Sequence, residues 1–186
     1  MIPIHDDNPA GRPAYVKWLL IAVCVVVFLV QATSPGPVQQ LIVYGFGLIP
    51  AVFNNYAALP AQADYLPAEL TLLTSMFLHG GFMHLAGNML YLWIFADNVE
   101  DAMGHGRFIV FYLICGLLAA GAQILQQPES LIPMVGASGA ISGVLGAYLF
   151  LYPRAQVLVL IPLGFIMHSA RVPAGLVLGL WFAIQF

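Results

Sequence analysis

The stretch LLIAVCVVVFLV, residues 19–30, contains no charged or strongly polar side chain. It lies inside a mostly apolar segment that begins at Tyr15 and ends near Ala32, and about 20 such residues cross a bilayer as an α-helix. A strand of a membrane β-barrel would instead alternate apolar and polar residues over about ten positions. The stretch therefore predicts a transmembrane helix over residues 15–32.

The whole 186-residue chain has the composition of a membrane protein. Hydrophobic residues make up 61% of it and charged residues only 7%, whereas soluble domains carry roughly 25% charged residues. So much apolar surface does not fit inside a soluble core of this size, so we expect the lipid bilayer to surround the chain. The windows that lack Asp, Glu, Lys and Arg are 18–63, 70–96, 108–128, 130–153, 155–170 and 172–186.

The distribution of basic residues predicts the orientation in the membrane. Arg12 and Lys17 flank the start of the first helix, and the next basic residue is Arg107. Because basic residues accumulate in cytoplasmic segments, we expect the N-terminus to be cytoplasmic. We interpret residues 1–14 as a flexible cytoplasmic tail and residues 15–186 as one transmembrane domain.

Four further spanning helices are expected after the first. The sequence indicates helices over 80–101, 108–126 and 136–152, and a last helix that starts at 171–173 with a proline in its first turn. The predicted fold class is therefore an all-α, polytopic transmembrane helical bundle with five spanning helices.

Two apolar stretches are too interrupted to span the membrane. Residues 38–69 carry glycine or proline at several positions, and they predict short helices at the outer membrane interface. Residues 155–170 contain Pro162 and Gly164 and number only 16. We expect an interfacial re-entry segment there.

Polar groups at membrane depth are costly and indicate functional sites. Two motifs qualify: HGGFMHLAGN at 79–88 and GASG at 136–139. His84 and Asn88 are four residues apart and hence lie on one helical face. Both motifs stand at the outer starts of inward-running helices, so Ser138 is expected at a similar depth. Free N–H groups at a helix start, together with these side chains, can stabilise a tetrahedral oxyanion, which indicates acyl-transfer chemistry.

The combination of FLHGGFMHLAGN (77–88) and GASG (136–139), in this order and on these helices, resembles the rhomboid family of intramembrane serine proteases. The resemblance covers the chain from about Tyr15 and implies a rhomboid-like bundle of six helices. It implies an endopeptidase that cleaves transmembrane protein substrates near the outer membrane face, with no cofactor, no metal and no nucleic-acid partner. The implied site residues are Ser138 as the nucleophile of a Ser–His dyad, His84 and Asn88 in the oxyanion hole, His79 at the water-filled mouth of the site, and the motif glycines Gly136 and Gly139.

The resemblance also implies a general base that these residues do not supply. Rhomboids carry this base as a histidine on the sixth helix, whereas the sequence stops at Phe186, in or just after the fifth. His168 is expected on the cytoplasmic side, across the membrane from Ser138. We therefore expect a chain truncated before the sixth helix, from a bacterial inner-membrane protein. The alternative is a catalytically inactive rhomboid-like protein that binds transmembrane clients.

The same residues also admit structural roles. Gly139 and Gly143 form a G-x-x-x-G, which lets helices approach closely, and Ser138 can be a small residue of that contact. The histidine and asparagine of the first motif can hydrogen-bond between helices. A metal at the two motif histidines is not expected, because they are five residues apart with no carboxylate or thiolate nearby. Glu100 is expected to cap a helix end or to pair with Arg107. Substrate identity and oligomeric state stay open.

Overall fold

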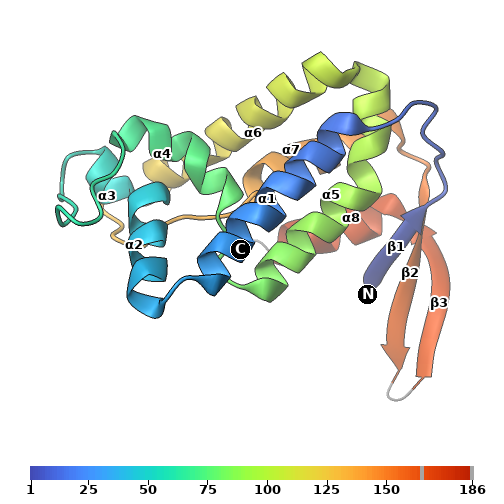
Figure 1. The fold of residues 1–186 in the computed structure, drawn as a ribbon. Coiled ribbons are helices and arrows are strands. Elements are labelled where there is room, and N and C mark those ends of the chain that lie inside the picture. Colours follow the sequence, from blue (N-terminus) through green and yellow to red (C-terminus); the bar gives the residue numbers. More distant parts are fainter. Residues whose placement is uncertain (164–165, 185–186) are drawn as a thin grey trace.

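The computed structural model describes residues 1–163 and 166–184, which form a mostly helical bundle with one small sheet (Figure 1). The longer helices are α1 (Tyr15–Thr33), α5 (Phe82–Met103), α6 (His105–Gln126), α7 (Ser138–Leu151) and α8 (Ala174–Ile184). The shorter ones are α2 (Gly36–Phe46), α3 (Pro50–Phe53), α4 (Ala68–Thr74) and the 3-10 helix η1 (Ser75–Phe77). The strands are β1 (Ile2–Asp6), β2 (Gln156–Leu163) and β3 (Ile166–Pro173).

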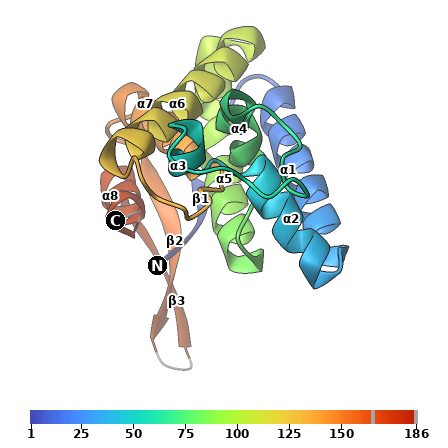
Figure 2. The same ribbon diagram turned by 90° about the vertical axis from the view of Figure 1, so that its left-hand side faces the viewer.

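Helix α5 is the centre of the bundle. It packs between α1 and α7, and α6 packs along α7 (Figure 2). The short helices α2 to α4 gather at the end where α5 begins, around residues 75–84, which we call the loop end (Figure 1). The sheet lies toward the opposite end, where α5 passes into α6 around residues 97–107, which we call the sheet end. The core between these helices is filled by large side chains, including Phe95, Tyr112 and Tyr148, all fully buried.

The helices predicted from the sequence are present, but residues 171–173, predicted to start the last helix, belong to β3, and that helix begins at Ala174. Within the described residues, α1 and α6 are long and apolar enough to cross a bilayer, and three shorter apolar helices run over Ala68–Phe77, Ser138–Leu151 and Ala174–Ala183. The interrupted stretch 38–69 contains the predicted short helices. Helix α2 crosses the start of this stretch, and α3 lies wholly inside it. The expectation of five spanning helices, made from composition, stays a prediction.

The glycines of α7 set how closely it approaches α6. A Cβ added at Gly139 would overlap Ala119, and one added at Gly143 would overlap Cys115. Both contacts are with α6, so the predicted packing role of the G-x-x-x-G is confirmed. Ser138 precedes this stripe by one residue, and consecutive residues of a helix point about 100° apart. Its side chain is therefore turned away from the α6 contact.

The prediction of an all-α fold was wrong in one region, because residues 155–170 are not an interfacial re-entry segment. Residues 156–163 and 166–170 belong to β2 and β3, which pair antiparallel, with Val157 opposite Val172 and Val159 opposite Ala170. Gly164, one of the two interruptions on which the prediction rested, lies outside the described residues. Val157 and Val159 are buried, whereas Gln156 is exposed. An apolar, β-branched run with this two-residue alternation fits a half-buried strand.

The prediction of a flexible tail over residues 1–14 was also wrong for its first part. Strand β1 pairs antiparallel with β2, so that the strand order in the sheet is β1-β2-β3. The register shifts between Pro3 and His5, and the inward-facing positions of β1 are Pro3 and Asp6, with Ile2 and Ile4 exposed. Tertiary pairing with a strand about 150 residues away therefore orders this segment.

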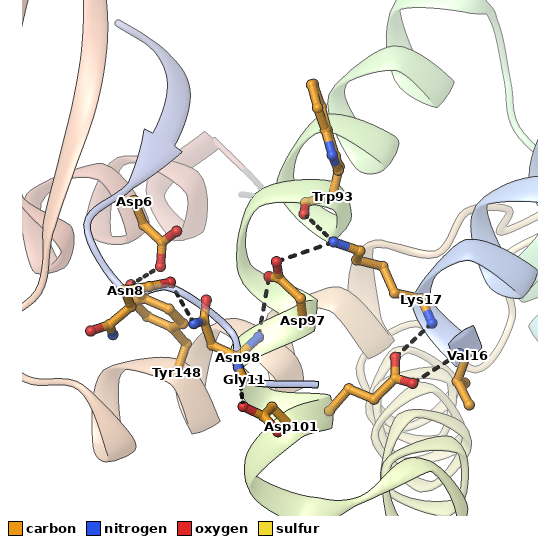
Figure 3. A network of polar contacts seen from close by, with 11 residues as sticks. Asp6, Asn8, Gly11, Val16, Lys17, Trp93, Asp97, Asn98, Asp101 and Tyr148 are labelled. Atoms are coloured by element: carbon orange, nitrogen blue, oxygen red, sulfur yellow. Dashed lines mark hydrogen bonds and ion pairs between the residues drawn. The ribbon is translucent and has the colours of Figure 1, made fainter. Parts of the chain in front are cut away.

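A network of buried polar groups ties β1 and the following loop to the helices (Figure 3). The Tyr148 hydroxyl of α7 donates to Asp6 Oδ2 at 2.6 Å. The Asn98 side-chain amide of α5 donates to the Asn8 carbonyl at 2.8 Å. Burial raises the pKa of the Asp6 carboxyl, an effect that the Tyr148 hydrogen bond opposes. The polar N-terminal segment is thus held at the sheet end by side chains of two different helices.

The carboxylate of Glu100 joins the end of α5 to the start of α1. It is 1% exposed and accepts the backbone N–H groups of Val16 at 2.9 Å and Lys17 at 2.8 Å. These N–H groups have no partner inside α1, and the negative carboxylate also interacts favourably with the positive end of the helix dipole. The third partner is His105 Nδ1, at 2.6 Å. Glu100 therefore caps a helix, as expected, but the side chain that it contacts is His105 and not Arg107.

Replacing Glu100 with alanine is expected to lower the free energy of unfolding by about 1–3 kcal/mol, because two buried N–H groups lose their acceptor. Thermal or denaturant unfolding in micelles measures this. Glu129 is exposed in the loop after α6, so Glu129→Ala is the matched control and should leave stability unchanged. Equal effects of the two substitutions would contradict the capping role.

Candidate functional site

The two motifs meet at the loop end, through the segment 75–81, which contains η1 and leads into α5. The carbonyl of Ser75 accepts the N–H of Gly136 at 2.9 Å, which ties this segment to the residues just before α7. The loop before α7 is held further by the first connecting loop, where Leu48 and Met134 exchange backbone hydrogen bonds at 3.1 and 2.7 Å. We call residues 75–81 the strap.

The imidazole of His84 lies between the strap and the loop before Ser138. Its Nδ1 accepts the N–H of Gly80 at 3.3 Å. Because Nδ1 is an acceptor, the neutral ring carries its proton on Nε2. A Cβ added to Gly136 would lie 2.8 Å from both Nε2 and Cε1 of His84, so the ring edge with this proton lies directly against Gly136. The N–H donor of His84 thus faces Gly136, which precedes Ser138 by two residues.

Asn88 lies one turn further along α5, on the face of His84. It is 1% exposed, and its Nδ2 donates to the His84 carbonyl at 2.9 Å. Its Oδ1 is buried and has no partner among the described residues. The amide group retains one N–H for another acceptor, because an amide NH₂ has two hydrogens.

Ser138 is the first residue of α7 and is half-buried, between buried Ala137 and half-buried Gly139. None of the hydrogen bonds found between described residues uses its hydroxyl. The first N–H groups of a helix have no partner within it; here the first intrahelical bond runs from Ile141 N–H to the Ala137 carbonyl. Ser138 therefore stands beside backbone donors at the start of α7.

His79 lies next to His84, with ring centroids 5.3 Å apart, but it is only 2% exposed. Both of its ring nitrogens are buried without a partner among the described residues. Burial, with a smaller contribution from neighbouring His84, lowers the pKa of His79 to about 4. The exposed member of the pair is His84. His79 thus packs behind His84, which does not fit the predicted place at a water-filled mouth.

Two residues at this end of the bundle gain a contact that the sequence analysis did not predict. Gln31 of α1 is 1% exposed and hydrogen-bonds the backbone of His79. The sequence feature that could have indicated this contact is a polar side chain directly after the continuous apolar run 19–30. Ser142, one turn after Ser138, accepts the indole N–H of Trp181 in α8 at 3.3 Å. His168, which was predicted to lie away from Ser138, is on β3 in the sheet.

Replacing Gly136 with alanine is expected to destabilise the protein by about 1–3 kcal/mol, because the new methyl group would displace the His84 ring. Its φ of +127° adds backbone strain for any residue with a side chain. Thermal unfolding measures the loss. Gly146, inside the helix that follows, α7, has open space around it, so Gly146→Ala is the control and should be neutral or slightly stabilising. A neutral Gly136→Ala variant would contradict the close approach of His84.

The low pKa of His79 predicts that stability falls as the pH is lowered from about 6.5 to about 4. Over this range an unfolded-state histidine, with a pKa near 6.5, binds a proton that the buried ring does not. Melting temperatures at a series of pH values measure the slope. His79→Phe should reduce it, whereas replacing the exposed His168 with alanine should not. An unchanged slope in His79→Phe would assign the acid sensitivity to other groups.

Comparison with known proteins places this arrangement in a family. Residues 68–186 match the Rhomboid domain. Rhomboid protease GluP of Bacillus subtilis is 36% identical over 140 residues, which cover 75% of this chain and 25% of the relative. Rhomboid protein 1, mitochondrial, of Saccharomyces cerevisiae is 35% identical over 104 residues, 54% of this chain and 30% of the relative.

A third relative is the putative rhomboid protease YdcA of Bacillus subtilis, 38% identical over 80 residues, 43% of this chain and 40% of that protein. The chain thus spans between a quarter and two fifths of the length of these relatives. The matched region includes the strap, α5 and the start of α7. The chain is a membrane protein that belongs to the rhomboid family.

Proposed function

We propose that this chain carries the nucleophile and the oxyanion-binding groups of an intramembrane serine endopeptidase. The observation that carries the proposal is the position of His84, whose Nε2 edge lies against Gly136, two residues before Ser138. A serine at a helix start, beside free backbone N–H groups and an imidazole donor, is the arrangement that acyl transfer requires.

Ser138 is assigned as the nucleophile. Its hydroxyl oxygen attacks the carbonyl carbon of the scissile peptide bond, the carbonyl π electrons move to oxygen, and a tetrahedral oxyanion forms. Three features support this role over packing: Ser138 is outside the glycine stripe that contacts α6, it is half-buried, and its hydroxyl is used by no hydrogen bond between described residues. Ser142, by contrast, is engaged by Trp181.

His84, Asn88 and the first N–H groups of α7 are assigned to the oxyanion. The Nε2 proton of His84 is the donor nearest to Gly136, and the Asn88 amide retains one free N–H. Removing a single donor of this kind costs about 10²–10³ in turnover. The motif glycines Gly136 and Gly139 serve this site by letting the His84 ring and α6 come close to the segment that carries Ser138.

The proton that leaves Ser138 needs a base, and neither the two histidines of the first motif nor His168 fits that role. His84 carries its proton on the nitrogen nearest to the serine loop, and its other nitrogen accepts from Gly80. His79 is buried behind it, and His168 lies on β3. We assign the base to a histidine outside residues 1–186, as the family resemblance implies. General-base catalysis is worth about 10²–10⁴-fold.

The substrates proposed are transmembrane proteins cut near the outer membrane face, after local unwinding of their helix exposes a peptide bond. In this assignment the loop end faces outward, and the N-terminus and the sheet end are cytoplasmic. Arg12, Lys17, Arg154 and Arg171 all lie toward the sheet end, in agreement with the excess of basic residues on cytoplasmic faces. A bacterial inner membrane is the proposed location.

Labelling with a fluorophosphonate, which reacts with activated serines, tests the proposal on the protein expressed from its native gene, read past the codon for Phe186. We expect labelling that is lost to background in Ser138→Ala. The matched control is Ser142→Ala, on the same face of α7 and held by Trp181, and it should still be labelled.

Absence of labelling in the natural protein would overturn the protease assignment and favour the alternative, a rhomboid-like protein that binds transmembrane clients without cutting them. Labelling that persists in Ser138→Ala would assign the nucleophile to another residue. A stop codon directly after Phe186 would also contradict the proposed external base.

A further inference from the structure

Gln31 is a buried amide near the end of α1, directly after the apolar run 19–30. The buried residues of α1 are Lys17, Leu20, Cys24 and Gln31, which form the stripe that faces the bundle. Lys17 at one end of this stripe reaches Asp97 at 3.2 Å and the Trp93 carbonyl at 3.1 Å. Gln31 is the polar residue at the other end, and its side chain reaches the strap.

Both polar atoms of the Gln31 amide bond to one residue. Its Nε2 donates to the His79 carbonyl at 3.3 Å, and its Oε1 accepts the His79 N–H at 3.2 Å. The side chain thus pairs with His79 as a neighbouring β-strand would. Unpaired backbone groups in such a buried position are costly, so this pairing favours a single conformation of the strap.

Among the described residues, the His79 ring makes no polar connection from the strap to a helix, and the backbone of Phe77, which acts on the ring, belongs to the strap itself. Both nitrogens of the ring lack a partner among the described residues. The ring therefore contributes packing, and the orientation of the backbone at this position depends on the Gln31 amide.

The His79 carbonyl and the Gly80 N–H belong to the same planar peptide unit and point in opposite directions. Gln31 holds the carbonyl side of this unit, and the N–H side donates to His84 Nδ1 at 3.3 Å. Rotation of the peptide plane would break both bonds together. The orientation of the plane therefore couples Gln31 to the proton position on His84, although the two side chains are not in contact.

We infer that Gln31 is a positioning residue that acts through the 79–80 peptide unit to keep the proton of His84 on Nε2, facing the serine loop. The inference rests on the proposed function for its catalytic meaning, because an Nε2 donor matters only if an oxyanion forms there. The coupling itself is a property of the strap and can be measured without turnover.

Nitrogen-15 NMR of the histidine rings, in the protein expressed from its native gene, measures the tautomer of His84 directly. The His84 signals are assigned by their loss in His84→Phe. We expect the natural protein to show the Nε2–H tautomer alone and Gln31→Met to show a mixture of both tautomers. Gln126→Met, at an exposed glutamine at the end of α6, is the matched control and should match the natural protein. A pure Nε2–H tautomer in Gln31→Met would overturn the inference.

Fluorophosphonate labelling of the same variants gives the second readout. Misplacement of a catalytic group by about 1 Å can cost on the order of 100-fold, so we expect Gln31→Met to label Ser138 roughly 10–100-fold more slowly than Gln126→Met. Melting temperatures identify a variant that fails to fold. In that case Gln31→Glu, which keeps the size and the acceptor oxygen, replaces it and should also show mixed tautomers.

The two proposals fail in different ways. If the natural protein is not labelled, the protease assignment fails, while the tautomer comparison still decides the role of Gln31. If Gln31→Met is labelled at the control rate with an unchanged tautomer, Gln31 is a packing residue and the protease assignment stands.

Discussion

The buried carboxylate of Glu100 is the interaction on which the arrangement of the bundle depends. A charged group in an apolar interior is stable only when it is fully paired, and Glu100 meets that condition by accepting the first N–H groups of α1 and the ring of His105. It thereby sets the start of α1 against the end of α5. Lys17 of α1, which is also buried, pairs with Asp97 of α5, the helix that carries Glu100.

With the sheet end fixed in this way, the relation between α1 and α5 at the loop end follows from helix geometry. The 19 residues of α1 rise about 28 Å at 1.5 Å per residue, which brings Gln31 level with the strap that precedes α5. Helix α1 thus has a polar connection to α5 at the sheet end and to the strap at the loop end. His84 and Asn88 belong to the first turns of α5, so their positions derive from both connections.

Ser138 reaches the same place through an independent set of contacts. Glycines of α7 allow close packing on α6, and the Gly136 N–H bonds to the strap. Ser138 and His84 are 54 positions apart in the sequence, yet hydrogen bonds to residues 75–81 hold both of their segments in place. A site assembled in this manner needs no polar cluster in the middle of the bundle, where its desolvation would be costly.

The helices and the two motifs could be predicted from the sequence because their signals are local. Long charge-free runs bounded by glycine and proline predicted 15–32 and 80–101, against Tyr15–Thr33 and Phe82–Met103 in the structure. That His84 lies close to the start of α7 followed from the direction of two helices. The bond between Gly80 and His84 could not be predicted, because it depends on the orientation of one peptide plane.

The sheet was missed because its signals are ambiguous or non-local. The run QVLVLIPL reads equally well as an apolar interfacial segment, and its proline suggested interruption where the structure has a strand. In β1 the sequence IPIHD points its isoleucines outward and Pro3 and Asp6 inward, the reverse of what hydrophobicity suggests. Only the presence of β2 and of the Tyr148 hydroxyl explains that choice.

The pairing of β1 with β2 also has a consequence for the order of assembly during synthesis. Asp6 and Tyr148 are 142 positions apart, and β2 begins later still, at Gln156. At about 5–20 residues per second, the ribosome makes that intervening chain in roughly seven to thirty seconds. Throughout that interval β1 has no partner strand, so it is made well before it can take its place in the sheet.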